Sequence, residues 1–125
     1  MSDSLLRLHA AVLDARFRDP AISRTAKLFA DGLPKMAKKV AEEAVELSLE
    51  ALQGDRQAAI RESADLIYNL AVLWAALDLE PADIWQELDR RERLYGMAEK
   101  LPKGSNAQRR KAPRQRAATI VPLPR

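Results

Sequence analysis

The chain has 125 residues, of which 47% are hydrophobic and 31% are charged, so its composition excludes a disordered polymer and a membrane protein and its length favours a single domain. It contains no cysteine, which excludes disulfides and thiolate metal sites. The net charge of +3 is unevenly divided, because residues 102–125 hold seven basic and no acidic residues and residues 1–101 hold 14 basic and 18 acidic ones.

The N-terminal part of the chain predicts one helix and one short helical segment. Hydrophobic residues at helical spacing predict a helix over residues 4–18, which ends just before Pro20 because the residue that precedes a proline disfavours the α region. Ser23 is a suitable N-cap for a short segment over residues 23–30, and the glycine at position 32 ends it.

Three longer helices are expected after this segment. The first covers residues 34–54, with Pro34 at its first position and Gly54 just beyond its last turn. An aspartate caps the next, over about 55–78, and a proline opens the last, over about 81–100. The predicted fold class is therefore all-α, a bundle of about four helices.

We expect the chain to have two parts. Residues 1–101 form the all-α domain, and residues 102–125, rich in proline and basic residues, form a flexible C-terminal tail. The tail contains Arg109-Arg110-Lys111 but no aromatic residues between its basic ones, so a solvated arm is favoured over nucleic-acid binding. The first ten residues lack the basic and long apolar segments of a secretory signal, and we expect a cytoplasmic protein.

The helix expected over about residues 55–78 indicates self-association. From Leu66 to Leu77 it is apolar almost all round, and a helix that is apolar on every side must be covered on every side. A body of about 100 residues with two long partner helices cannot cover it alone. We therefore expect a homodimer around a two-fold axis. The stretch is shorter than the ~20 residues that a membrane span needs, so no membrane association is expected.

Two pairs of acidic residues flank the turn between the helices expected over residues 34–54 and about 55–78. Glu43 and Glu46 lie about 60° apart on one helix, and Glu62 and Asp65 repeat the same spacing on the next. If both pairs face inward, four carboxylates converge and repel one another by roughly 3–4 kcal/mol per pair at an effective dielectric near 20. A cation would neutralise them, and oxygen ligands without histidine or cysteine favour Mg²⁺ or Mn²⁺.

The alternative is a solvated acidic face, since glutamate is a strong helix former and glutamate pairs are common on exposed helices. The position of Asp65 favours the metal site. It opens the most apolar helix of the chain, where a charge is expected only when it is paired or bound to a metal.

These carboxylates resemble the signature of the MazG-like all-α nucleotide pyrophosphohydrolases. The motif E-E-x-x-E corresponds to Glu42, Glu43 and Glu46, and E-x-x-D corresponds to Glu62 and Asp65. In that superfamily Glu43, Glu46, Glu62 and Asp65 would be metal ligands by their motif positions. Glu42 would orient or deprotonate the attacking water, and Glu42 and Glu43 are the expected catalytic residues.

The surrounding sequence is similar to the phosphoribosyl-ATP pyrophosphatase branch, over about residues 5–95. The segments that carry this similarity are SRTAKL at 23–28 and KKVAEEAVE at 38–46. The resemblance implies Mg²⁺-dependent hydrolysis of phosphoribosyl-ATP to phosphoribosyl-AMP and pyrophosphate, the second step of histidine biosynthesis. It also implies a helical bundle assembled as an intertwined homodimer in the cytoplasm.

The chain departs from the branch at two positions. Asn69 stands where the branch usually has histidine, and Ala41 where a glycine is often found. Asn69 can bind substrate through hydrogen bonds but cannot act as a general acid or base. These departures motivate one alternative, a relative that hydrolyses another nucleoside triphosphate. A second alternative is a non-catalytic helical dimer whose basic tail binds RNA or a protein partner.

Basic residues near the motifs are candidates for substrate binding. Arg24, Lys27, Lys38 and Lys39 could contact phosphate oxygens, with Lys39 preferred because it lies one turn before the acidic motif. The alternative for the lysines is pairing with glutamates four residues away, and Arg24 could simply lie at a helix start. His9 is expected at the surface, near the polar side of the first helix.

Overall fold

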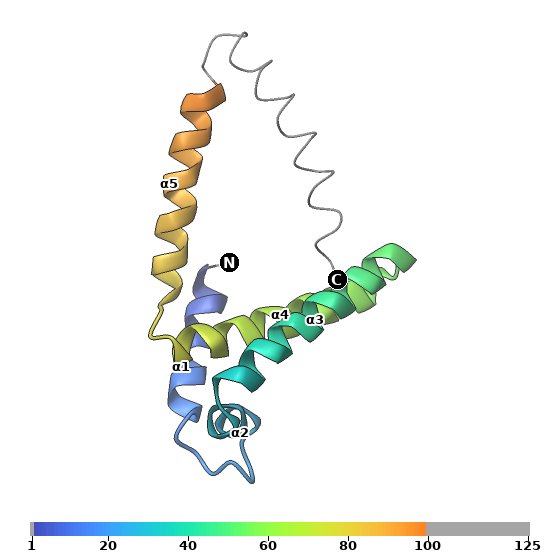
Figure 1. Ribbon diagram of the computed structural model, residues 1–125, viewed down its shortest axis with the longest axis vertical. Helices are drawn as coiled ribbons and strands as arrows, with labels where there is room; N and C mark the ends of the chain where they lie inside the picture. Colours follow the sequence, from blue (N-terminus) through green and yellow to red (C-terminus); the bar gives the residue numbers. More distant parts are fainter. Residues whose placement is uncertain (1, 100–125) are drawn as a thin grey trace. The chain divides into compact units, whose positions relative to one another are not determined.

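The computed structural model describes residues 2–99, and these residues form helices without any strand (Figure 1). The helices are α1 (Ser2–Ala15), α2 (Arg24–Asp31), α3 (Leu33–Gln53), α4 (Arg56–Ala76) and α5 (Pro81–Glu99). The all-α prediction is confirmed. There are five helices here rather than about four, because the short segment after Ser23 is a regular helix.

The chain divides into two units, Met1–Ile84 and Trp85–Arg125. The first unit contains α1 to α4 and the start of α5. The part of the second unit that the structure describes is the rest of α5. The predicted boundary between residues 101 and 102, and the predicted tail, lie outside the described residues. No helix within residues 2–99 combines the length and the apolar character that crossing a membrane requires.

Local sequence signals explain where the helices begin and end. The hydroxyl of Ser23 accepts a hydrogen bond from the Ala26 amide at 3.1 Å and caps α2. The carboxylate of Asp55 accepts one from the Ala58 amide at 3.0 Å and caps α4. Between α3 and α4, Gly54 has a φ of 76°, a left-handed conformation that residues with a Cβ atom rarely adopt.

Two predicted helix ends lie two or more residues from the observed ones. The prediction placed the end of the first helix at Arg18, but α1 ends at Ala15, where the Arg18 amide donates to the Ala15 carbonyl at 3.0 Å and tightens the last turn. Helix α4 ends at Ala76 rather than near Asp78, and Asp78 has a φ of 58°. In both places the chain leaves the helix through a turn that hydrophobic periodicity does not encode.

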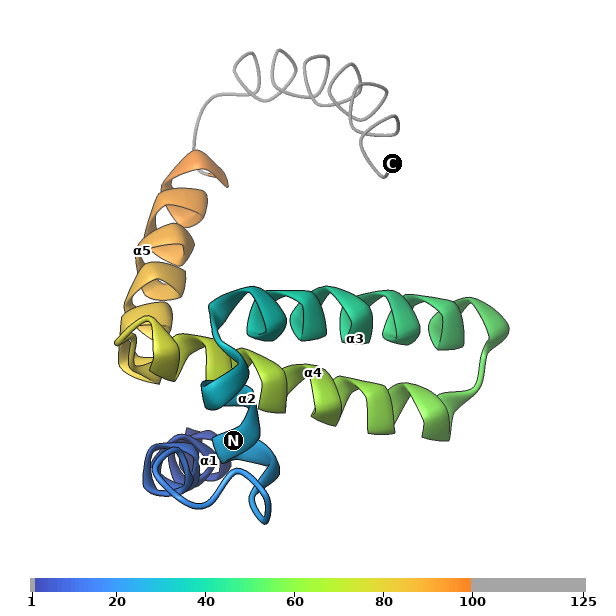
Figure 2. The ribbon, with the colours of Figure 1, turned by 60° about the horizontal axis from the view of Figure 1, so that its bottom comes forward.

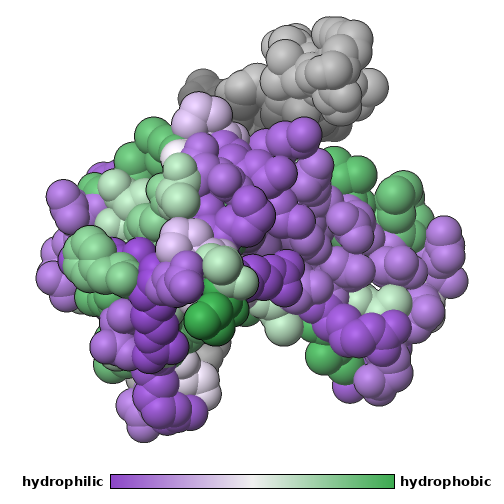
Figure 3. Space-filling model, turned by 90° about the horizontal axis from the view of Figure 1, so that it is seen from below, coloured by the Kyte–Doolittle hydropathy of each residue, from purple (hydrophilic) through white to green (hydrophobic). Residues whose placement is uncertain are grey.

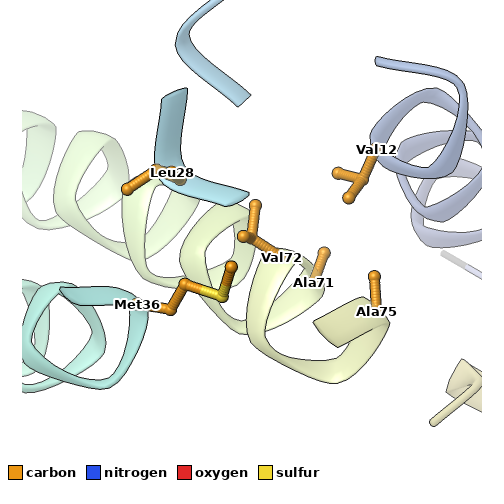
Figure 4. Close-up of a cluster of buried hydrophobic side chains, with 6 residues drawn as sticks. All are labelled: Val12, Leu28, Met36, Ala71, Val72 and Ala75. Carbon is orange, nitrogen blue, oxygen red and sulfur yellow. The ribbon is translucent and has the colours of Figure 1, made fainter. Parts of the chain in front are cut away.

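The core lies where α1, α2 and α3 meet the second half of α4. Figure 4 shows its buried side chains, which come from all four helices: Val12 from α1, Leu28 from α2, Met36 from α3, and Ala71, Val72 and Ala75 from α4. The two alanines of α4 let the neighbouring helices approach its backbone closely, and the larger residues fill the space between the helices. This packing holds α3 and α4 as an antiparallel hairpin (Figure 2).

The hairpin leaves hydrophobic side chains exposed. Val45, Leu49 and Leu52 of α3 and Ile60 and Ile67 of α4 are between 47% and 85% exposed. Hydrophobic residues also reach the surface among hydrophilic ones on the face seen in Figure 3. The apolar stretch of α4 is therefore only partly covered by the residues that the structure describes, and the homodimer stays a prediction.

Candidate active site

Three of the four carboxylates predicted to bind a metal come together between α3 and α4. Glu43 of α3 and Glu62 and Asp65 of α4 each offer a carboxylate oxygen, and these oxygens all lie within 4.8 Å of one another. Glu43 is only 6% exposed, Glu62 is half-buried and Asp65 is exposed. We call Glu43, Glu62 and Asp65 the carboxylate group; it is buried at Glu43 and open to solvent at Asp65.

The carboxylate group is electrostatically unfavourable without a counterion. One oxygen of Glu43 and one of Glu62 are buried without a hydrogen-bond partner within the described residues. The pKa of Glu62 is raised above its ordinary value, chiefly because it shares a hydrogen bond with Glu43 and also because of burial and the charges of Glu46, Glu43 and Asp65. A bound cation would provide a partner for the buried oxygens and would offset the charge repulsion that contributes to the raised pKa of Glu62.

Glu46, the fourth predicted ligand, is not one of the three side chains that converge. It is exposed and lines an open hollow on α3 with Ala41, Glu42 and Val45. Its charge nevertheless acts on Glu62. Glu42 and Glu46 therefore flank the carboxylate group on the solvent side, where a reacting molecule can reach them.

The lysines near the motifs form ion pairs within their own helices. Lys39 lies 3.7 Å from Glu43 and 3.8 Å from Glu42, and Lys38 lies 4.0 Å from Glu42. On α2, a lysine–aspartate pair, Lys27 and Asp31, is separated by 3.5 Å. Two of these pairs, Lys38–Glu42 and Lys39–Glu43, are the lysine–glutamate pairs four residues apart that the alternative interpretation anticipated. Contact of the lysines with substrate stays a prediction, and Lys39 is the one that touches the carboxylate group itself.

A second cluster links α2 to α4. The hydroxyls of Thr25 and Tyr68 form a hydrogen bond of 2.7 Å, and the Arg24 guanidinium lies over the Tyr68 ring, 5.7 Å from its centre. The sequence pattern indicates a role for Arg24 but none for Tyr68. The available signal was its position three residues after Asp65, which places both side chains on one side of α4.

Two side chains lie deeper than the sequence indicated. Asn69 is 2% exposed, and its amide donates to the carbonyl of Asp65 at 2.9 Å, so contact with substrate would require the amide to become accessible. The prediction of a surface position for His9 is wrong. It is half-buried beside a hollow that Arg16 and Asp78 also line, and its Nδ1 is buried, because α1 turns this side toward the end of α4.

An all-helical fold whose central hairpin gathers carboxylates around a potential cation site defines the class of MazG-like pyrophosphohydrolases. Within that class, the chain belongs to the phosphoribosyl-ATP pyrophosphohydrolase family, which matches residues 5–92. Family membership confirms the resemblance that the acidic motifs and their flanking segments indicated.

Individual relatives agree with the family. The chain is 56% identical to phosphoribosyl-ATP pyrophosphatase 2 of Rhodopseudomonas palustris, over 98% of this chain and 92% of the relative. It is 60% identical to phosphoribosyl-ATP pyrophosphatase 2 of Bradyrhizobium diazoefficiens, over 84% and 78% respectively. It is 53% identical to phosphoribosyl-ATP pyrophosphatase of Azospirillum brasilense, over 75% and 85%.

Proposed function

We propose that the chain hydrolyses phosphoribosyl-ATP to phosphoribosyl-AMP and pyrophosphate, the second step of histidine biosynthesis. Family membership and relatives of 56–60% identity that carry this enzyme's name support the proposal. The observation that carries it in the structure is the carboxylate group, in which Glu43, Glu62 and Asp65 bring oxygens within 4.8 Å of one another. Phosphoanhydride hydrolysis at a site of this kind needs no covalent nucleophile.

The residues of the carboxylate group fit a divalent cation. Their donors are all carboxylate oxygens, and two of these oxygens are buried and unpartnered within the described residues, so Mg²⁺ is the expected ion and Mn²⁺ a possible substitute. Glu43, Glu62 and Asp65 would hold it, with Glu46 completing the set from the solvent side. When bound, magnesium polarises phosphoryl oxygens, lowers the pKa of a coordinated water and neutralises charge on the leaving pyrophosphate.

The protein's own side chains orient the water and the phosphates. Glu42 is exposed beside the carboxylate group and held by Lys38 and Lys39, so it can accept a proton from the attacking water. Lys39, which pairs with Glu43, and Arg24, which has no ion-pair partner among the described residues, are the preferred basic residues to bind phosphate oxygens, and Lys38 and Lys27 are further candidates. Asn69 would contribute from its buried position through the backbone of Asp65.

Assembly and location are part of the same proposal. The enzyme acts as an intertwined homodimer in the cytoplasm, and the exposed hydrophobic residues of the α3–α4 hairpin support a partner copy. Its ligand is a nucleotide, and nucleic acid is not expected as a partner.

The test is an assay of pyrophosphate release from phosphoribosyl-ATP in the presence of Mg²⁺, with ATP and other nucleoside triphosphates as competing substrates. We expect phosphoribosyl-ATP to be the preferred substrate. Preference for another nucleoside triphosphate would instead support the alternative that Asn69 and Ala41 motivate.

The site is tested in the same assay by substitution. Glu43→Gln and Asp65→Asn should each lower turnover by at least ~10²-fold, since even residues that merely support a metal ligand cost 10–100-fold when changed. Glu92→Gln, which removes an exposed carboxylate of α5 that is not a member of the carboxylate group, is the matched control and should keep full activity. Full activity in both site variants, with helical circular dichroism unchanged, would show that the site is elsewhere.

A further inference from the structure

Tyr68 is held at two places by neighbouring residues of α2. Its hydroxyl forms a 2.7 Å hydrogen bond with the hydroxyl of Thr25, and its ring lies under the guanidinium of Arg24, 5.7 Å from Arg24 Cζ. Thr25 and Tyr68 are half-buried, whereas Arg24 is exposed. The ring is therefore fixed by its edge while its face supports a cation that solvent and ligands can reach.

This arrangement lies next to the carboxylate group. Tyr68 follows Asp65 by three residues on α4, a spacing that brings side chains to one side of a helix about 5–6 Å apart at their Cβ atoms. Arg24 is therefore a positive group at the edge of a site built to bind a cation and a polyphosphate. A cation at the carboxylate group binds only part of a polyphosphate chain. The remaining negatively charged oxygens of that chain extend beyond the carboxylate group.

The ion pairs distinguish Arg24 from the other basic candidates. Lys27, Lys38 and Lys39 each lie within 4.0 Å of a carboxylate of their own helix. Among the residues that the structure describes, Arg24 has no such carboxylate partner, and its guanidinium lies over the Tyr68 ring. An arginine presented on an aromatic face keeps its planar set of N–H donors available, and that geometry suits two oxygens of one phosphate.

We propose that Tyr68 is a positioning residue of this enzyme. Its ring holds the Arg24 guanidinium where it binds a phosphate of the substrate, and Thr25 fixes the ring through the hydroxyl bond. The inference rests on the proposed function, since it takes a phosphorylated nucleotide as the ligand. It adds two residues, Thr25 and Tyr68, that act on the substrate through Arg24.

The first experiment separates binding from turnover in four variants. Arg24→Ala should raise KM for phosphoribosyl-ATP at least ~10-fold, because a hydrogen bond to a charged group is lost. Tyr68→Phe and Thr25→Val each remove the neutral hydroxyl bond and should raise KM about 2- to 10-fold, with kcat nearly unchanged. Thr25→Ser keeps the hydroxyl and should restore the wild-type KM.

The second experiment is a double-mutant cycle. Its expected result, given below, would not be found if Tyr68 had a merely structural role. If Tyr68 acts through Arg24, the variant Arg24→Ala/Tyr68→Phe should have the KM of Arg24→Ala alone. Tyr95→Phe, which removes the hydroxyl of an exposed tyrosine of α5, is the matched control and should leave KM unchanged. Additive effects on KM would overturn the proposal, as would a fall in Tm with KM unchanged within twofold.

A third measurement keeps this inference separate from the proposed function. Calorimetric titration of phosphoribosyl-ATP in Mg²⁺, with all proteins also carrying Glu42→Gln to prevent turnover, reports affinity alone, and Arg24→Ala and Tyr68→Phe should weaken it in the same order as they raise KM. If phosphoribosyl-ATP binds with this dependence but the wild type does not hydrolyse it, the proposed reaction fails and the positioning role stands. Equal affinities in all variants would refute the positioning role even in an active enzyme.

Discussion

At the scale of single residues, the unusual feature is a buried glutamate with two acidic neighbours. Glu43 is 6% exposed, and Glu62 and Asp65 come within 4.8 Å of it. The pKa of Glu62 is raised above the ordinary 4.5 because of this neighbourhood. The folded state thus binds the Glu62 proton more tightly than the unfolded state does, so the metal-free protein loses stability as the pH rises from the ordinary value through the raised pKa.

The first prediction concerns Glu43→Gln. It removes one charge from the carboxylate group, so in EDTA at neutral pH its Tm should exceed that of the wild type, and its Tm should fall less with rising pH. Magnesium at 100 times its Kd should stabilise the wild type by about 2.7 kcal/mol, and the variant by much less. Thermal unfolding with and without Mg²⁺ measures both effects.

Glu92→Gln is the control for this prediction, because it removes a carboxylate from an exposed position of α5. It should keep the wild-type response to Mg²⁺ and to pH. A Glu43→Gln protein that is less stable in EDTA and still gains the full Mg²⁺ effect would contradict the assignment of Glu43 as a ligand.

At the scale of elements, helix α5 carries a compact group of charges. Glu87 accepts hydrogen bonds from Arg90 at 2.7 and 3.0 Å and from Arg91 at 2.9 Å. These hydrogen bonds lower the pKa of Glu87 from 4.5 to about 2. A depressed pKa means that the folded state favours the charged form, so this contribution to stability is present above pH 4.5 and is lost as the pH falls through about 2.

We therefore predict that Glu87→Gln lowers the Tm slightly at pH 7, as expected for an exposed set of ion pairs. The difference from the wild type should shrink as the pH falls below 4.5, and also in high salt, because the pairs are open to solvent. Thermal unfolding followed by circular dichroism over this pH range measures it. A difference that is constant with pH and salt would assign the effect to helix propensity instead.

The α3–α4 turn provides a third prediction. Gly54 adopts a φ of 76° and no atom lies within 4 Å of the place where a Cβ would stand, so Gly54→Ala adds backbone strain without a clash. It should lower the free energy of unfolding by about 1–2 kcal/mol. Gly96 of α5 also has open space around it but an ordinary helical backbone, so Gly96→Ala should stabilise by up to ~1 kcal/mol. Urea unfolding of both variants tests the contrast.

Helix starts and ends could be predicted because they depend on local signals. Ser23, Asp55 and Gly54 act where their residue types indicated, through caps and a left-handed turn. The end of α1 could not be predicted, because its last turn tightens through backbone bonds that no residue type specifies. Local rules therefore describe the elements of this chain better than their exact lengths.

Local sequence rules do not predict which carboxylates of the site converge. Carboxylate spacing predicted that four groups would converge, but it does not determine how α3 is rotated about its axis. That rotation is set by packing: Met36 is buried in the core seven residues before Glu43, nearly two helical turns, so both face α4. Glu46 lies about 60° from Glu43 around the helix axis and therefore faces solvent. The Thr25–Tyr68 bond could not be predicted either, since it depends on how α2 packs against α4.

At the scale of the whole molecule, the α3–α4 hairpin has hydrophobic surface that residues 2–99 leave exposed. Val45 and Leu49 of α3 and Ile60 and Ile67 of α4 are about half exposed. Their spacings of four and seven residues place each pair on one side of its helix. Hydrophobic stripes of this kind, on the hairpin that also carries the carboxylate group, are typical of surfaces that another subunit covers.

The last prediction is that these stripes mediate dimerisation. Ile67→Glu places a charge at the start of the apolar stretch of α4, where burial in an interface would require an unpaired carboxylate to lose its hydration. Sedimentation at micromolar concentration should give a dimer for the wild type and a monomer for this variant. Gln57→Glu adds the same charge at an exposed polar position of α4 and should leave the dimer intact. The contact surface would have to lie elsewhere if Ile67→Glu remained dimeric, and a monomeric wild type would mean that the stripes stay exposed to water.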